Sequence, residues 1–151
     1  MLTLARVTSD NPDFCALVQL LDQELAERDG ADSAFYAQYN TLTRIRHAVV
    51  AYADGQPAGC GAFKEFEAGA VEIKRMYVAV AHRRQGVAQA VLGELERWAA
   101  ELGYATAVLE TGRRQPEAIA LYQRSGYQLT VNYGQYVGIE NSVCMCKPLG
   151  Q

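Results

Sequence analysis

The hydrophobic and polar positions of this chain follow two periods, and the changes between them mark the expected elements. Residues 2–7 alternate apolar and polar side chains, which is typical of a half-buried strand. Phe14, Leu17, Leu21 and Leu25 then recur at helical spacing, which predicts a helix with one apolar face. The first helix should therefore cover a sheet to which the first strand belongs.

Three helices have boundaries that can be read from single residues. Asn11 is a good N-cap with Pro12 at the first helical position, and this helix should end near Gly30. Pro116 and Gly126 close a short helix at both ends. The third helix begins near Val87 and has an apolar stripe of Val87, Val91, Leu95, Trp98 and Leu102.

The remaining periodic segments predict strands and one further helical piece. The expected strands are residues 2–7, 47–53, 58–65, 70–80, 105–110, 127–131 and 142–147. A turn at 54–57 joins two of them, and a short helical piece is expected at 33–39. Strand, two helices, three hairpin-linked strands and then alternating helices and strands indicate an α+β fold with a mixed sheet flanked by helices.

Composition and charge narrow the class of protein. The 151 residues, 50% of them hydrophobic, suit a single domain spanning 1–151 with a substantial core. A net charge of −3 argues against a nucleic-acid or anionic-membrane surface. The chain has no long apolar run and no leader pattern, so a cytoplasmic location is expected. The four cysteines are expected to be free thiols, and no cysteine–histidine spacing indicates a metal site.

The segment 81–88, Ala-His-Arg-Arg-Gln-Gly-Val-Ala, has the chemistry of a phosphate-binding loop. It lies between an expected strand and an expected helix, so the free amides of the helix start can face an anion. Gly86 permits close approach of a phosphate, and Ala88 keeps the first turn uncrowded. A solvated turn is the alternative. The segment lacks the Gly-Lys-Ser/Thr of a nucleotide P-loop and the three glycines of a dinucleotide-binding fold.

A second motif follows at 115–127, where a short helix leads into a strand. The two motifs, in this order, resemble the GNAT superfamily of acyl-CoA-dependent N-acyltransferases. Gln115 stands where that family commonly has asparagine, and the likeness runs from about residue 49 to 127. The matching residues are Arg83, Gly86 and Ala88 in the first motif, and Ala118, Leu121, Tyr122, Gly126 and Tyr127 in the second.

The resemblance implies a fold and a cofactor. The fold would be a three-layer α/β/α sandwich, with a mixed, mostly antiparallel sheet splayed between its fourth and fifth strands. The cofactor would be acetyl-CoA, and no metal is implied. The implied cofactor-binding residues are Met76, Tyr77, Val78, Arg83, Arg84, Gln85, Gly86, Val87, Ala88, Gln115, Ala118 and Tyr122.

Acetyl transfer to an amine needs a proton acceptor and an acid for the leaving thiolate. The resemblance gives the acid role to Tyr122, whose alternative is aromatic packing, and the base role to Glu72. The alternative interpretation of Glu72 is a salt-bridged surface residue. Glu110 is the second candidate base, and a water relay can take the place of either carboxylate. The resemblance also implies that a strand bulge near 76–78 offers a backbone N–H to the thioester oxygen.

The acceptor is expected to be a small-molecule or amino-acid-like primary amine, acetylated directly in a ternary complex. The alternatives are a protein or peptide acetyltransferase, acting on an N-terminus or a lysine, and a non-catalytic acyl-CoA sensor. The oligomeric state is left open between monomer and homodimer. The candidate substrate-binding residues are Glu24 in the acidic first helix, Glu110, Arg113, and the tyrosines Tyr133 and Tyr136 of a Gly- and Tyr-rich loop.

Overall fold

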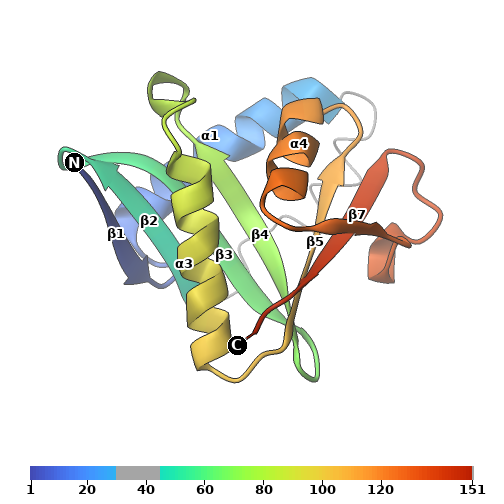
Figure 1. The fold of residues 1–151 in the computed structure, drawn as a ribbon. Helices are drawn as coiled ribbons and strands as arrows, with labels where there is room; N and C mark the ends of the chain where they lie inside the picture. Colours follow the sequence, from blue (N-terminus) through green and yellow to red (C-terminus); the bar gives the residue numbers. More distant parts are fainter. Residues whose placement is uncertain (30–44, 151) are drawn as a thin grey trace.

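A seven-stranded sheet forms the middle layer of the molecule, with helices on both faces (Figure 1). The computed structural model describes residues 1–29 and 45–150. The helical piece expected at 33–39 lies outside these residues. The elements are β1 (Leu2–Val7), α1 (Pro12–Asp29), β2 (His47–Ala53), β3 (Gln56–Glu67), β4 (Ala70–Val78), the 3₁₀ turn η2 (Val80–His82), α3 (Val87–Glu101), β5 (Thr106–Gly112), α4 (Pro116–Arg124), β6 (Gln128–Thr130), the 3₁₀ turn η3 (Gly134–Tyr136) and β7 (Ser142–Pro148).

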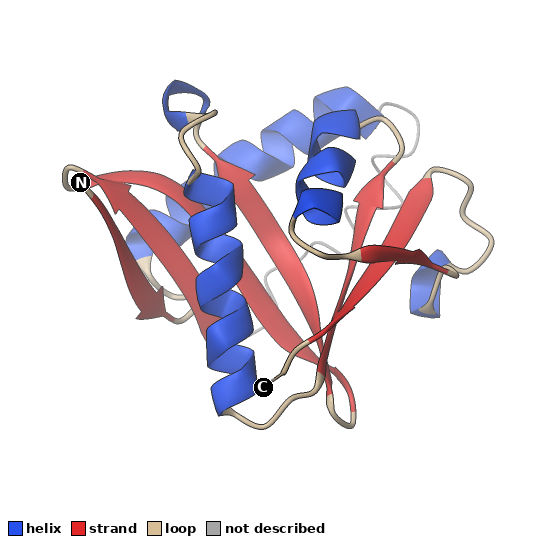
Figure 2. Cartoon of the chain, viewed as in Figure 1, coloured by secondary structure: helices blue, strands red, loops and turns tan. Residues whose placement is uncertain are grey.

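The sheet is mixed and mostly antiparallel, as predicted. Its strand order is β1-β2-β3-β4-β5-β7-β6, and among the described strands only β4 and β5 pair in parallel. Each of the two parallel strands is followed in the chain by a connection that contains a helix: α3 after β4, and α4 after β5. The ends of these strands and the starts of these helices therefore meet at one end of the molecule (Figure 2).

Each face of the sheet is covered by a separate hydrophobic cluster. On one face α3 and α4 pack against the strands, with Val91 and Leu95 of α3 buried against Phe63. On the other face α1 buries Phe14 and Leu17 against β2 and β3. The three-layer arrangement expected from the sequence is thus confirmed, and it leaves the ends of β4 and β5 between the two helix layers (Figure 1).

The expected apolar stripe of α3 is correct except at its end. Val87, Val91 and Leu95 are buried, and Trp98 lies edge-on to His47 and Phe63. Leu102 is 49% exposed because the helix ends at Glu101 and the chain turns away there.

Several strand ends differ from the expectation. The turn after β2 contains only Asp54 and Gly55, both with positive φ (49° and 83°), so β3 already begins at Gln56 and runs to Glu67. This backbone matches the twist of the flanking strands, which makes a two-residue hairpin favourable. β4 ends at Val78, not at 80, whereas β5 continues to Gly112 and β6 is limited to 128–130.

The sheet splays between β4 and β5. Their parallel ladder consists of the pairs from Ala70↔Thr106 to Ile73↔Leu109 and then stops. β4 continues to Val78 and β5 to Gly112, so the two strands diverge toward the end where α3 and α4 begin (Figure 1). Beyond Ile73, the edge of β4 that faces β5 has no strand partner within the described part of the sheet.

A bulge shifts the side-chain alternation of β4 at the same place. Cys60 pairs with Tyr77 and Ala62 with Lys74, so two β4 residues, Arg75 and Met76, lie opposite a single residue of β3. Arg75 has a φ of 62°, which is unusual for a non-glycine residue. The extra residue keeps Arg75 on the α1 face beside Lys74, and its guanidinium contacts Asp22 of α1.

Candidate active site

The loop between β4 and α3 presents free backbone donors at a helix start. Gly86 is the N-cap residue of α3, with a φ of 80°, and no side chain caps the helix. Arg84 also has a positive φ, 64°, so the loop folds tightly before the helix. Amides of a first helical turn without a side-chain cap are suited to an anion, because both the N–H groups and the helix dipole attract negative charge.

Arg83 fastens this loop to its surroundings. Its Nε donates to the carbonyl oxygen of Val78 at 2.8 Å, and its Nη2 donates to the carboxylate of Glu24 at 2.9 Å. Its guanidinium also lies over the ring of Tyr77, 5.5 Å from the centroid. Glu24, predicted as a substrate-binding residue, therefore serves here as the partner that joins α1 to the loop.

A groove of about 560 Å³ runs from this loop along the end of β4 to α4. Of the residues predicted to bind the cofactor, all except Gln85 line this groove. Gln85 is exposed on the loop. Residues far apart in the sequence, such as Val78, Gly86 and Ala118, thus form one continuous wall.

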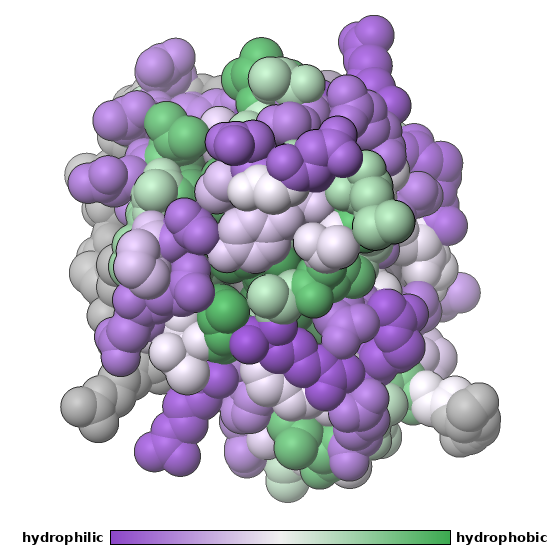
Figure 3. Space-filling model, turned by 90° about the vertical axis from the view of Figure 1, so that its left-hand side faces the viewer, coloured by the Kyte–Doolittle hydropathy of each residue, from purple (hydrophilic) through white to green (hydrophobic). Residues whose placement is uncertain are grey.

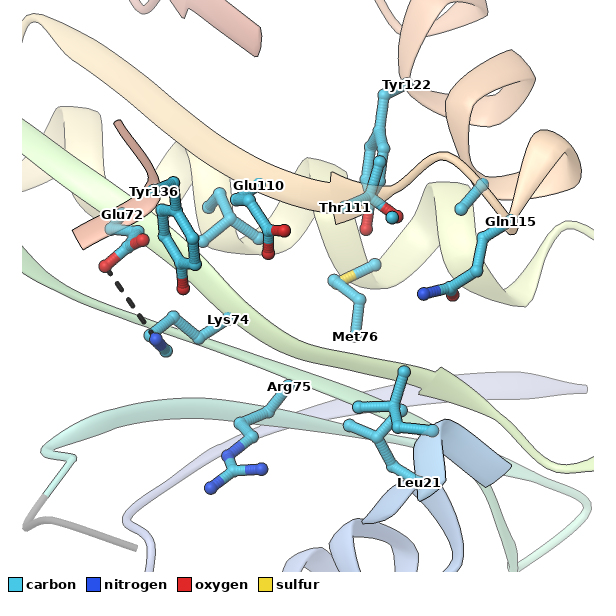
Figure 4. Close-up of a pocket in the computed structure, with 14 residues that line it drawn as sticks. Leu21, Glu72, Lys74, Arg75, Met76, Glu110, Thr111, Gln115, Tyr122 and Tyr136 are labelled. Carbon is cyan, nitrogen blue, oxygen red and sulfur yellow. Dashed lines mark ion pairs between the residues drawn. The ribbon is translucent and has the colours of Figure 1, made fainter. Parts of the chain in front are cut away.

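A second cavity, of about 130 Å³, opens where β4 and β5 separate. It contains Glu72 and Lys74 of β4 and Glu110 and Thr111 of β5, with Tyr136 at its side (Figure 4). The groove and the cavity share their lining at one place. The residues common to both are Leu21, Met76, Gln115, Ala118 and Tyr122.

Tyr122 lies at this junction. Its side chain is 7% exposed, and its ring packs edge-on against Tyr127 with centroids 5.9 Å apart. Burial, with a smaller effect of the Glu110 charge, raises the pKa of its hydroxyl above the ordinary value near 10.0. The hydroxyl is therefore protonated at neutral pH and available as a proton donor.

Both candidate bases lie in the small cavity. Glu72 is only 3% exposed, accepts a hydrogen bond from the Tyr133 hydroxyl at 2.8 Å and lies 3.9 Å from Lys74 Nζ. The alternative for Glu72, a salt-bridged surface residue, is thus half correct: the ion pair exists, but the carboxylate is buried. Glu110 is partly buried and close enough to Tyr122 for its charge to act on that hydroxyl (Figure 4).

Comparison with known proteins agrees with this geometry. Residues 14–127 match the profile of the acetyltransferase (GNAT) family. The chain belongs to the GNAT acetyltransferase family. It is 33% identical over 150 residues to an IAA acetyltransferase of Azospirillum brasilense, covering 97% of each chain.

Solved structures give the same result for the fold. A protein from Klebsiella pneumoniae subsp. pneumoniae, assigned as an acyl-CoA N-acyltransferase, is 32% identical over 99% of each chain, with a TM-score of 0.83. A GNAT family acetyltransferase from Elizabethkingia anophelis, crystallised with acetyl-CoA bound, shares the fold at 19% identity over 98% of each chain, with a TM-score of 0.70. The GNAT protein described here is thus an acyltransferase, and its cofactor is acetyl-CoA.

The fold places the remaining predicted substrate-binding residues of this acetyltransferase at different positions relative to the small cavity. Tyr136 is buried and lines the small cavity. Tyr133 lies behind it, and its hydroxyl holds Glu72. Arg113 is exposed, and its Nε donates to the carbonyl oxygen of Glu140 at 2.5 Å, which stabilises the loop before β7. Arg113 does not line the cavity, so the fold gives no support to its role in substrate binding.

The sequence interpretation missed Lys74, Arg75 and Thr111 as residues of the small cavity. A detectable signal was the run of charged residues in the middle of a strand that is central in the sheet. Strands covered on both faces are normally almost entirely apolar, so charges at 72, 74 and 75 indicate a cavity against that strand. No comparable feature of the sequence predicts the bulge that keeps Lys74 and Arg75 on one face.

Further features concern the cysteines, the candidate metal ligands and the length of the helices. All four cysteines are free, with Cys60 and Cys144 buried. Within residues 1–29 and 45–150, no group of three or more His, Cys, Asp or Glu side chains is arranged around a common metal position. No helix in these ranges has the length and apolar character needed to span a membrane. On the face shown in Figure 3, hydrophobic side chains form small groups between hydrophilic ones.

Proposed function

We propose that this protein transfers the acetyl group of acetyl-CoA to the primary amine of a small molecule, directly and within a ternary complex. One observation carries the proposal. The long groove and the small cavity meet at Met76 and Tyr122, so a thioester in one and an amine in the other reach the same point. Holding two reactants in contact removes much of the entropic barrier of a bimolecular step.

The groove suits coenzyme A in its charge and in the elements that form its walls. The diphosphate would lie on the backbone amides at the start of α3, with Gly86 allowing close approach and Arg84 adding positive charge. The pantetheine arm would follow the unpaired edge of β4 at Met76–Val78, between the diverging strands. Gln115 and Ala118 of the α4 region would form the opposite wall.

The same edge of β4 can stabilise the transition state. Beyond Ile73 its main-chain groups have no partner in β5, and the bulge at Arg75–Met76 redirects them. A fixed backbone N–H aimed at the developing oxyanion contributes about 3–4 kcal/mol in well-studied enzymes. Because the donor is backbone, the side chain of Met76 is free to pack against the core.

Acetyl-CoA supplies an activated acetyl group, whose C–S bond breaks as the amine nitrogen bonds to the carbonyl carbon. Glu110 accepts the proton released by the amine, because it faces the junction and its charge acts on Tyr122. Tyr122 donates its proton to the departing sulfur. Glu72, predicted as the base from the sequence, is held by Tyr133 farther into the cavity and would balance the charge of the incoming ammonium.

The size of the cavity favours a small acceptor over a polypeptide. Its volume of about 130 Å³ is walled by Leu21, Leu25 and Tyr136. A peptide N-terminus or a protein lysine needs an open approach for the flanking chain. A pure acyl-CoA sensor needs neither the two carboxylates nor the tyrosine at the junction. The cytoplasmic location, the single domain and the monomer or homodimer state stay predictions.

The test measures free CoA thiol released from acetyl-CoA across a panel of small amines, amino acids and peptides with free N-termini. Rates measured while both substrates are varied should give intersecting double-reciprocal lines, as direct transfer in a ternary complex requires; parallel lines would indicate a covalent acetyl-enzyme instead. Glu110→Gln should lower kcat by about 100-fold or more and Glu72→Gln should mainly raise KM. Turnover of peptides alone, or tight CoA binding without any turnover, would contradict the proposal.

A further inference from the structure

The small cavity contains a largely buried lysine that has an ion pair but no close hydrogen bond among the described residues. The side chain of Lys74 is only 10% exposed, and its Nζ lies 3.9 Å from the nearest carboxylate oxygen, Glu72 Oε1. That separation is too long for a good hydrogen bond. Within the described residues, the ion pair with Glu72 is the one polar contact of this ammonium, which has three donors to satisfy.

Arg75 adds a second positive charge to the same wall. Its Nη1 donates to Asp22 at 3.0 Å, but the Asp22 side chain is 49% exposed and is therefore well screened by solvent. Arg75 Nε and Nη2 are buried and have no hydrogen-bond partner among the described residues. Such groups are rare in native proteins because a buried donor without a partner costs about 1–3 kcal/mol.

The negative charges of the cavity are arranged differently. Glu110 comes from β5 and lies next to Thr111 and near Tyr122, at the junction with the cofactor groove (Figure 4). Lys74 and Arg75 come from β4 and lie away from Tyr122, Lys74 beside Glu72 and Arg75 toward α1 (Figure 4). The cavity therefore has one carboxylate, Glu110, at the reacting centre, and the Lys74–Glu72 ion pair and Arg75 farther from it.

We propose that the acceptor is an amino-carboxylic acid, whose carboxylate binds the ammonium of Lys74 while its amino group lies at Glu110. The inference rests on the proposed function and narrows its substrate class. A simple amine leaves Lys74 with Glu72 at 3.9 Å and leaves Nε and Nη2 of Arg75 without a hydrogen-bond acceptor among the described residues. An amino acid supplies one, together with the amine that the reaction consumes. Burial lowers the pKa of Lys74, and a bound carboxylate counteracts that effect by stabilising the charged form.

The experiment compares three acceptors that share one side chain: an amino acid, its carboxamide and the decarboxylated amine. Each kcat/KM is corrected for the fraction of neutral amine at the assay pH. The wild type should prefer the acid by about 10- to 100-fold, the range expected for one charge-assisted hydrogen bond in a site of low polarity. Several side chains are needed in the panel, because the rest of the cavity sets the preference among amino acids.

Lys74→Met removes the charge and keeps much of the apolar stem. It should raise KM for the acid by about the same 10- to 100-fold and leave kcat/KM for the decarboxylated amine within about threefold. Lys74→Arg, which keeps the charge, should restore part of the preference. Lys64→Met is the matched control, because Lys64 lies on the neighbouring strand opposite Glu72 but is exposed. It should leave all three acceptors unchanged.

Thermal unfolding and CoA binding of each variant show whether it is folded. Equal kcat/KM for the acid and the decarboxylated amine in the wild type would overturn the inference and leave the proposed function intact. The same conclusion follows if Lys74→Met, while folded and CoA-binding, slows all three acceptors equally. If the wild type turns over no amine of any class, the proposed function fails, and this inference fails with it.

Discussion

Replacing Tyr122 with phenylalanine removes one oxygen atom at the place where the groove meets the cavity. The ring stays, so its packing against Tyr127 is retained. Within the described residues, no hydrogen bond to the Tyr122 hydroxyl is present, so folding loses little when the oxygen is deleted. We expect the free energy of unfolding to change by less than about 1 kcal/mol.

The expected effect on the reaction is much larger. Burial raises the pKa of Tyr122 above its ordinary value, so the hydroxyl keeps its proton until the thiolate leaves. A positioned general acid contributes about 10²- to 10⁴-fold to a rate. At 1.36 kcal/mol for each factor of ten, the Tyr122→Phe variant should lose about 3–5 kcal/mol of transition-state stabilisation. The loss should be in kcat, because the hydroxyl acts on the leaving group.

The assay measures kcat by CoA thiol release with the best acceptor, and CoA affinity by calorimetry. Tyr127→Phe is the matched control, since Tyr127 is also buried, but its hydroxyl donates to Glu96 at 2.9 Å and lies outside both cavities. Its kcat should stay near that of the wild type. If Tyr122→Phe retains a kcat within about threefold of the wild type, the thiolate takes its proton elsewhere, and the acid role of Tyr122 is refuted.

Two further predictions concern stability. An alanine at Gly61 would place its Cβ 2.5 Å from Met76 Sδ, so Gly61→Ala should destabilise the fold by about 1–3 kcal/mol in urea unfolding, whereas Gly93→Ala, with its nearest contact at 3.5 Å, should be neutral or stabilising. Burial, with a smaller effect of the Arg46 charge, lowers the pKa of His47 below 6.5. The unfolded chain therefore binds a proton more readily, and the free energy of unfolding should fall as the pH drops below about 6.5. Urea unfolding at pH 7.5 and 5.5 should show a smaller fall for His47→Gln than for the wild type; an equal fall would assign the pH dependence to other groups.

Much of the fold was predictable because its signals are local. Asn11 accepts hydrogen bonds from the backbone N–H groups of Asp13 and Phe14, both at 3.0 Å, as an N-cap residue should. Pro116 begins its helix for an equally local reason, the fixed φ of proline. The errors occur at strand ends such as 54–57, where pairing with the neighbouring strand decides the boundary, and at Leu102, where the direction in which the chain leaves α3 decides it.

The candidate site also contains some residues that the sequence could predict and others that it could not. Gly86 and the start of α3 were identifiable as a candidate phosphate-binding loop, because such a loop is made of consecutive residues. The contacts of Arg83 with Glu24 and Val78 were not predictable, since they depend on how α1 approaches the loop. Lys74 was not identified because its position depends on the partner strands and on where β5 diverges.

By itself, the sequence determined helices α1, α3 and α4, most of the strands, the loop proposed to bind phosphate and the family, because each depends on residues close together in the chain. Only the tertiary structure decided what surrounds the reacting centre. The bulge at Arg75 sets which side chains of β4 face α1, and the end of the β4–β5 ladder at Ile73 opens the cavity. Both depend on strand register, which is fixed by contacts between residues distant in the sequence. The charges proposed to select the acceptor are therefore a property of the folded sheet.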